Sequence, residues 1–288
     1  MSVSLGESGK TAWRFSRSKK LVDPVRVPCG RCIGCKLERA RQWSVRCMHH
    51  AQMREDNSFI TLTYDEKHLP ADGGLRPEHF TNFMKALRPR VGAPIEYFMC
   101  GEYGDNFGRP HYHAILFGVR FPDEELLSTT SAGSTLCTSA VLTALWRRGF
   151  ATIGAVTLES AAYVARYTSK KIYGSKASRH YTKIDPHSGE IFRIKSEYIR
   201  MSLKRPIGRN WFDQFKSDVY PRDEVIVRGQ RQKPPRYYDK QLSEAEIQPI
   251  KTTRKEYAKK STDNTQARLD ARELVKLAQI KQLKRDLQ

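Results

Sequence analysis

The sequence has no long apolar run, no apolar segment near its N-terminus and few acidic residues. No run approaches the ~18 apolar residues that a membrane-spanning helix requires, which excludes a membrane-spanning protein. The N-terminal stretch MSVSLGESGKTAWRFSRSKK lacks the apolar core of a secretory signal. We therefore expect a protein of the reducing cytoplasm, in which the 6 cysteines are thiols or metal ligands rather than disulfides.

Two further shortages narrow the function. The sequence contains no G-x-x-x-x-G-K-[ST] loop, so no nucleotide-driven motor is expected. Asp and Glu number 31 against 51 Lys and Arg, which gives a formal net charge of +20. That excess is more than solubility requires and indicates a polyanionic partner, most simply nucleic acid. The hydrophobic fraction of 39% is high enough to build a core and excludes wholesale disorder.

Helix and strand patterns alternate irregularly along the chain. The apolar spacing predicts helices over 36–54, 77–87, 141–148 and 160–172, and strands over 59–64, 95–102, 111–117 and 150–156. Residues 121–140, rich in Ser and Thr, are interpreted as an insertion of loop and short helix. This order predicts an α+β fold in which helices cover one face of a single sheet.

Composition divides the chain into three parts. Residues 1–28 are polar and basic and form an expected N-terminal arm, and residues 29–221 carry the main domain with a Cys-rich entry loop at 29–35. Residues 222–288 are interpreted as a basic linker, with QKPP near 234, followed by a helical tail. The tail is either a solvated helix or a segment that contacts DNA or a partner.

The sharpest motif is the triplet His-Tyr-His at 111–113. Alternate residues of a strand share a face, so His111 and His113 are expected to point the same way, about 7 Å apart. They could be two partly exposed surface histidines. Glu102, at the end of the preceding strand, favours the alternative, because a hairpin would bring its carboxylate beside the imidazoles. Three mixed N/O ligands suit Mg²⁺ or Mn²⁺ in a catalytic site.

A second motif lies on the helix expected over 160–172. At 100° per residue, one arc of about 140° contains two phenols, a guanidinium and two ammonium groups, namely Tyr163, Arg166, Tyr167, Lys170 and Lys171. A basic surface helix whose tyrosines merely pack would show the same pattern. Phenols are poor nucleophiles unless cations stabilise the phenolate, and these cations lie one turn away.

Four cysteines near the start of the main domain form a third candidate site. Cys29, Cys32 and Cys35 follow two C-x₂-C steps, and Cys47 lies twelve residues further on. This spacing is typical of a zinc or iron–sulfur loop, so a structural Zn²⁺ on the four cysteines is one hypothesis. Three reduced thiols in a turn before a helix, with Cys47 in the core, are the other.

The blocks CGEYGDNFGRPHYHAILFG and YVARYTSKK together resemble the HUH endonuclease superfamily. The resemblance covers roughly residues 25–215 and is strongest to the two-tyrosine rolling-circle replication initiation proteins of microviruses, the gokushovirus-like single-stranded DNA phages. It implies an RRM-like antiparallel sheet with helices on one face, the HUH strand at its centre and the tyrosine helix beside that strand. It implies the metal ligands Glu102, His111 and His113, and the nucleophiles Tyr163 and Tyr167.

The resemblance also implies an activity: site-specific nicking and joining of single-stranded DNA at a viral origin through a 5′-phosphotyrosine. Phosphate contacts are expected from Arg109 and Arg166, and charge stabilisation from Lys170 and Lys171. Host helicase and polymerase would be partners in the host bacterial cytoplasm, without a membrane. Alternatives are a plasmid relaxase or transposase of the same superfamily, or a non-catalytic RRM-like nucleic-acid-binding module.

Overall fold

The computed structural model describes residues 28–30, 32–92, 94–104, 107–129, 133–170, 172, 174–184, 188–260 and 265–282. The side chains of residues 167–170, 176, 259 and 281 are not part of this description. Of the sequence expectations, the arm over 1–27 and the role of Lys171 lie outside the described residues.

One seven-stranded sheet organises the described chain, and every neighbouring pair of its strands is antiparallel. In spatial order its strands are β4 (Glu125–Thr129), β5 (Thr135–Thr138), β6 (Gly149–Gly154), β1 (Asn57–Tyr64), β3 (Pro110–Phe117), β2 (Glu96–Tyr103) and β9 (Tyr198–Met201). The strand that carries the His-Tyr-His triplet, β3, is flanked on both sides by full-length strands. The α+β prediction is therefore confirmed.

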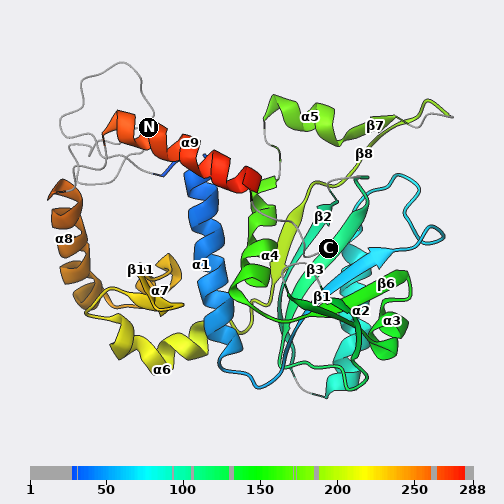
Figure 1. Ribbon diagram of the computed structural model, residues 1–288, viewed down its shortest axis with the longest axis horizontal. Helices are drawn as coiled ribbons and strands as arrows, with labels where there is room; N and C mark the ends of the chain where they lie inside the picture. The colour runs from blue at the N-terminus through cyan, green and yellow to red at the C-terminus, as the bar shows by residue number, and fades with distance from the viewer. Residues whose placement is uncertain are drawn as a thin grey trace.

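Helices cover both faces of this sheet (Figure 1). Helices α2 (Pro77–Val91) and α3 (Ala140–Trp146) pack on one face, where Tyr112, Ala114 and Leu116 of β3 point. Helices α1 (Ile33–Ala51) and α4 (Leu158–Lys170) pack on the other face, against Ile115 and Phe117. The first layer is the one expected from the sequence. Helix α1 adds a second layer beside the tyrosine helix, because β3 alternates apolar side chains to both faces.

The interpretation of 121–140 as loop and short helix was wrong. This segment contains strands β4 and β5, which pair with each other and extend the sheet. The pairing of β5 with β6, Leu136 with Gly154 and Cys137 with Ile153, supplies the hydrogen bonds that a Ser/Thr-rich segment does not signal locally. The edge of the sheet therefore decided the conformation, not the local composition.

The C-terminal third forms a smaller layer beside α1. Its elements are α6 (Arg209–Val219), β10 (Val225–Val227), β11 (Gln230–Gln232), α7 (Arg236–Asp239), α8 (Glu244–Lys260) and α9 (Gln266–Gln282). A separate apolar cluster, centred on Phe212 and Tyr238, joins these elements to Val45 of α1. The segment interpreted as a linker thus contains the β10–β11 hairpin. Within the described ranges, no helix is both long and apolar enough to cross a membrane.

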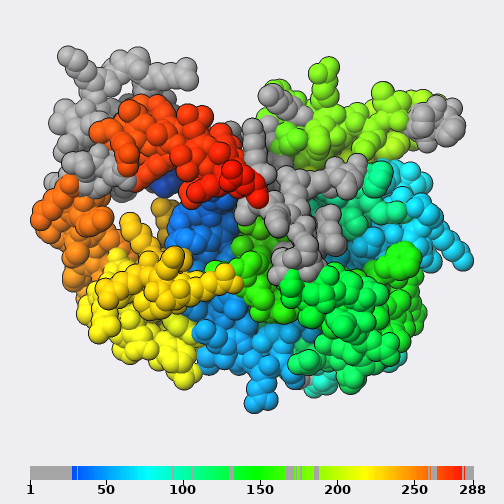
Figure 2. All heavy atoms as spheres, in the orientation of Figure 1, coloured from blue at the N-terminus to red at the C-terminus, as the bar shows by residue number. Residues whose placement is uncertain are grey.

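A short projecting unit follows α4. It consists of α5 (Ser175–Tyr181) and a two-stranded ribbon of β7 (Thr182–Ile184) and β8 (Ile191–Arg193), separate from the main sheet. Figure 1 shows it extending beyond the end of β2 and β3, and in Figure 2 it stands out from the body of the molecule. We refer to residues 174–195 as the flap.

Candidate active site

Strand β3 places both histidines of the triplet on the face covered by α1 and α4. His113 is fully buried, whereas His111 is half-buried toward the end of the strand. Their ring centroids are 6.2 Å apart. Tyr112, between them, points to the opposite face, where its hydroxyl hydrogen-bonds to Tyr64 and to the backbone of Arg76. The bulky middle residue of the triplet is thus buried with its polar group satisfied.

The neighbouring strand β2 brings Glu102 into the same site. Glu102 is the direct partner of His111 in the β2–β3 register, and its Oε1 lies 2.8 Å from Nε2 of His113. The carboxylate is completely buried. The structure therefore brings together the two imidazoles and the carboxylate that the hairpin argument predicted.

Two threonines on β1 orient the imidazoles, and the sequence analysis missed both. The hydroxyl Oγ1 of Thr61 lies 2.9 Å from Nδ1 of His113, and Oγ1 of Thr63 lies 3.0 Å from Nδ1 of His111. Each threonine is the register partner of its histidine across β1 and β3. The signal was the alternation Thr-Leu-Thr in the strand 59–64, which puts two hydroxyls on one face.

The site keeps His111 neutral near pH 7. Burial lowers the pKa of His111 to about 4, and the nearby His113 and Arg109 lower it further. A neutral imidazole whose Nδ1 is held by a hydroxyl offers its Nε2 lone pair to a cation. Gly104 leaves room at this atom, since a Cβ there would lie 3.0 Å from Nε2 of His111.

These residues fit a divalent cation of the kind that the sequence implied. Two imidazoles with oriented Nε2 atoms and a buried carboxylate make a mixed N/O set, which Mg²⁺ or Mn²⁺ accepts. A carboxylate buried beside a buried imidazole also needs positive charge to offset its desolvation. Glu102, His111 and His113 are the residues that would hold the ion.

Helix α4 places Tyr163 directly over this group. Its small apolar residues Ala161, Val164 and Ala165 are buried against α1 and the sheet, which allows close approach. The Oη of Tyr163 donates to Oε1 of Glu102 at 3.4 Å, and its ring meets the His113 ring edge-on at 5.0 Å. A phenolic oxygen thus lies at the candidate metal group.

The other residues expected on α4 are located less completely. Tyr167 and Lys170 lie on the last turns of α4, but their side chains are outside the description. Arg166 is half-buried on the same helix, three residues after Tyr163. Arg109 begins the approach to β3, and its guanidinium forms an ion pair with the exposed Glu66. Its contact with DNA stays a prediction.

The three cysteines at the start of α1 also form a group that could hold a metal ion. The ligand atoms of Cys29, Cys32 and Cys35 all lie within 4.8 Å of one another. The proposal of Cys47 as a fourth ligand was wrong. Cys47 is fully buried in the apolar cluster between α1 and the sheet, and twelve helical residues separate it from Cys35 by about 18 Å.

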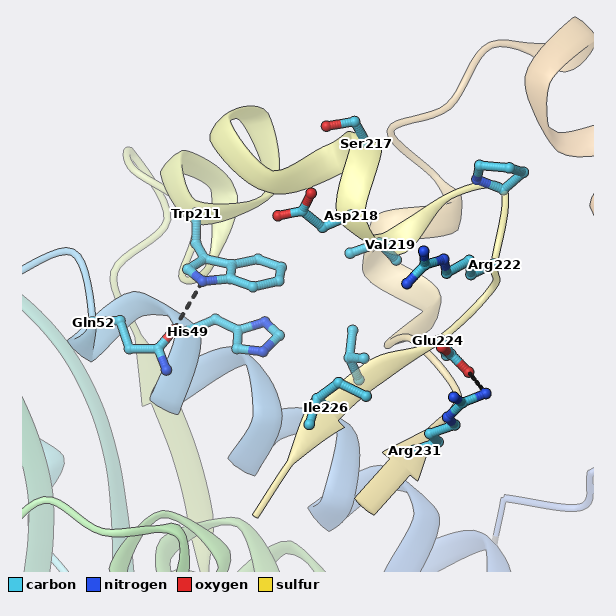
Figure 3. A pocket seen from close by; sticks show the side chains of 12 residues that line it. His49, Gln52, Trp211, Ser217, Asp218, Val219, Arg222, Glu224, Ile226 and Arg231 are labelled. Carbon is cyan, nitrogen blue, oxygen red and sulfur yellow. Dashed lines mark hydrogen bonds and ion pairs between the residues drawn. The ribbon is translucent and has the colours of Figure 1, made fainter. Parts of the chain in front are cut away.

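The molecule has a larger cavity elsewhere. A cavity of about 650 Å³ lies between the end of α1, helix α6 and strand β10, and its lining includes His49, Trp211 and Ile226 (Figure 3). It shares no residue with the Glu102–His111–His113 group. The chemistry-bearing residues therefore lie at the sheet rather than in this cavity.

The same part of the chain matches a family model. Residues 57–172, from β1 to just beyond α4, match the model of the replication-associated protein ORF2 family. This region contains the triad, both threonines and the tyrosine helix.

Three phage proteins are similar to the chain. The replication-associated protein VP4 of Bdellovibrio phage phiMH2K is 33% identical over 241 residues, covering 80% of this chain and 72% of the relative. The replication-associated protein ORF2 of Spiroplasma virus 4 is 33% identical over 86% of this chain and 79% of the relative. The replication-associated protein ORF4 of Chlamydia phage 1 is 30% identical over 74% and 52%. The chain belongs to the family of phage replication-associated proteins. No solved structure matches it.

Proposed function

We propose that this protein is a metal-dependent HUH single-stranded DNA endonuclease and strand transferase that starts and ends rolling-circle replication of a phage genome. The observation that carries the proposal is the phenol of Tyr163, 3.4 Å from the Glu102 carboxylate of the His-His-Glu group. The names of the relatives, all replication-associated proteins of phages, support the process. We place it in the host bacterial cytoplasm.

The reaction is a transesterification. The Tyr163 oxygen attacks the scissile phosphorus, the bond from phosphorus to the 3′ oxygen breaks, and a 5′-phosphotyrosine and a 3′-hydroxyl result. The phenolic proton is directed toward Oε1 of Glu102, and the leaving 3′ oxygen takes up one proton. A Mg²⁺ or Mn²⁺ ion, when bound, would polarise the non-bridging phosphate oxygens. One phosphodiester replaces another, so rejoining needs no nucleotide.

The second tyrosine completes the cycle. Tyr167 lies four residues, about one helical turn or ~6 Å, after Tyr163 on α4 and would cut the regenerated origin. The displaced 3′-hydroxyl then attacks the first phosphotyrosine, which closes the circle and frees the phenol. Arg166, Lys170 and Lys171 would contact flanking phosphates, as would Arg109. Host helicase and polymerase would extend the 3′-hydroxyl.

The test is covalent capture. The protein is incubated with Mn²⁺ and tiled oligonucleotides from its own phage genome and then run on a denaturing gel. We expect a shifted adduct that His113→Ala abolishes, while DNA binding persists because it depends mainly on the basic surface. Tyr163→Phe should retain adduct only on Tyr167, and Tyr163→Phe with Tyr167→Phe should form none. An adduct in the double variant would contradict the proposal.

The same assay separates the alternatives. A relaxase or transposase would form an adduct on a transfer or transposon end but on no phage oligonucleotide. A non-catalytic RRM-like binding module would bind oligonucleotides and form no adduct with any metal. Either pattern would overturn the proposed function.

We also propose that the metal at the three cysteines is a structural Zn²⁺. The Sγ atoms of Cys29 and Cys35 are 3.9 Å apart, and Zn–S bonds of about 2.3 Å in a tetrahedron put two sulfurs ~3.8 Å apart. Cys32 is the N-cap of α1 and its amide donates to Sγ of Cys29, so the loop is already closed around the site. The ion would fasten residues 29–35 to the start of α1.

Elemental analysis of protein purified without a metal column tests this proposal. We expect one zinc per chain, lost in Cys32→Ser. The matched control Cys137→Ser, a half-buried cysteine on β5, should retain it. Cys47→Ala should also retain zinc while lowering stability through a core cavity. A zinc content near zero in the wild-type protein would contradict the site.

A further inference from the structure

The flap, residues 174–195, is anchored at the edge of the active site. The Oη of Tyr103, the residue after Glu102, donates to the carbonyl oxygen of Lys195 at 2.7 Å. At the other end, the backbone N–H of Ile172, two residues beyond α4, donates to Oη of Tyr181 at 3.1 Å. Tyr181 is buried and also bonds to the buried carboxylate of Glu197. The flap base is thus tied both to the Glu102 strand and to the tyrosine helix.

Beyond this base, the ribbon exposes an apolar pair. Ile184 and Ile191 are direct partners across β7 and β8, and they are 64% and 68% exposed. Two large aliphatic side chains at the outer end of an isolated ribbon gain nothing from the fold of the chain. Thr182 and Arg193, the register pair two positions back, share their face.

The charge of the flap is strongly positive. Its sequence has five Lys and Arg against two Asp and Glu. Arg179, Lys183 and Arg193 are exposed, and none of them forms an ion pair with the part of the chain that the structure describes. Exposed cations without acidic partners beside an aliphatic pair match a polyanion that also offers apolar contact surface, which is nucleic acid.

The shape of the flap distinguishes base-paired from single-stranded DNA. Sequence-tolerant contacts to single strands rely on exposed aromatic platforms, and the exposed pair here is aliphatic. A two-stranded ribbon fits a groove of duplex DNA, and Ile side chains serve as wedges between base steps. We infer that the flap grips base-paired DNA that directly adjoins the single strand held at the Glu102–His111–His113 group. The inference deepens the proposed function and depends on it for the position of the single strand.

Fluorescence anisotropy with two labelled probes tests the inference. One probe is a 40-nucleotide single strand of mixed sequence, and the other is a 20-base-pair hairpin with a 15-nucleotide single-stranded tail. We expect Ile184→Ser with Ile191→Ser to weaken hairpin binding 5- to 10-fold and to leave the single strand unchanged. Lys183→Ala with Arg193→Ala should weaken hairpin binding and lower the salt slope by up to about 2, near 0.9 per lost phosphate contact.

The matched control is Lys240→Ala with Lys255→Ala, which removes two exposed cations from the C-terminal layer. An equal loss in this control would mean that total charge, not the flap, sets affinity, and would overturn the inference. An equal loss on both probes would assign the flap to single strands, and no loss on either would remove it from the DNA interface. Formation of the covalent adduct in the capture assay is read separately. Its absence in the wild type would count against the proposed function and leave the hairpin comparison intact.

Discussion

At the scale of single residues, the site is set by hydrogen bonds between neighbouring strands. Thr61 and Thr63 hold the Nδ1 atoms of His113 and His111, and Glu102 meets Nε2 of His113. A hydroxyl that accepts from Nδ1 fixes the tautomer in which Nε2 carries the lone pair. The orientation of both imidazoles is therefore built before any cation binds.

Replacing Thr61 with Val should weaken metal binding while preserving the fold. Val keeps the shape and the strand preference of Thr but cannot hydrogen-bond to His113. We expect the Mn²⁺ dissociation constant to rise about 10- to 100-fold, which is typical when a partner of a metal-bound histidine is removed. Titration of Mn²⁺ followed by electron paramagnetic resonance measures it without any DNA.

Thr152→Val provides the control for this prediction. Thr152 is the register partner of Thr61 on the other side, on β6, and is similarly half-buried. It should bind Mn²⁺ like the wild type. Unchanged affinity in Thr61→Val, or equal weakening in both variants, would show that the hydroxyl does not orient His113.

At the scale of elements, the position of β6 against β1 depends on one glycine. Gly149 pairs with Tyr64 at φ +135°, a conformation that L residues rarely adopt. A Cβ there would lie 2.2 Å from the backbone nitrogen of Asp65 and 2.6 Å from the carbonyl oxygen of Thr63. The strand that carries Thr61 and Thr63 is held at this contact.

We expect Gly149→Ala to destabilise the protein by more than about 2 kcal/mol, because backbone strain and a clash with another backbone act together. The free energy of unfolding in urea measures the effect. Gly154→Ala, at the other end of β6, is the comparison. Its Cβ would meet only side chains, the Phe59 ring at 3.4 Å and Leu136 at 3.8 Å, which are ordinary contacts. Equal losses in the two variants would contradict the argument.

At the scale of the whole molecule, α1 joins two apolar clusters. Its residues Ala40, Cys47 and Ala51 pack on the sheet, whereas Val45 packs with the C-terminal layer. His49 lies at this junction, where its ring stacks on Trp211 at 3.5 Å and its Nδ1 lies 2.8 Å from Oη of Tyr238. Burial lowers the pKa of His49 to about 4.

The stability of the junction should therefore fall as the pH is lowered. An unfolded histidine binds a proton near pH 6.5, but folded His49 does so only near pH 4. Lowering the pH through this window favours the unfolded chain, so the contribution of His49 is full above pH 6.5 and is lost between pH 6.5 and 4. One such group adds a slope of up to about 1.4 kcal/mol per pH unit.

Urea unfolding at pH 7, 6 and 5, followed by tryptophan fluorescence, measures this slope. We expect His49→Gln to make it shallower. The neighbouring His50, whose pKa burial also lowers to about 4, should keep part of the pH dependence. His68→Gln, an exposed histidine, should leave the slope unchanged. An identical slope in His49→Gln and the wild type would contradict the assignment.

Local patterns were enough to locate most elements that build the site. Strand alternation put His111 and His113 on one face, and helical spacing put Tyr163 and Tyr167 on one helix, because both periodicities are properties of the backbone alone. The turn between β2 and β3 gave Glu102 its place beside the histidines. These relations span a few residues or one hairpin, so the sequence by itself determined them.

Relations between distant segments were decided only by the tertiary structure. The strands over 125–138 form because β6 offers an unpaired edge, and Thr61 meets His113 only through the register of β1 with β3. Cys47 was separated from the other cysteines because helix α1 carries it ~18 Å along its axis and buries it on the sheet. Sequence spacing does not encode which edge, register or face a segment meets, because packing against the rest of the chain makes that choice.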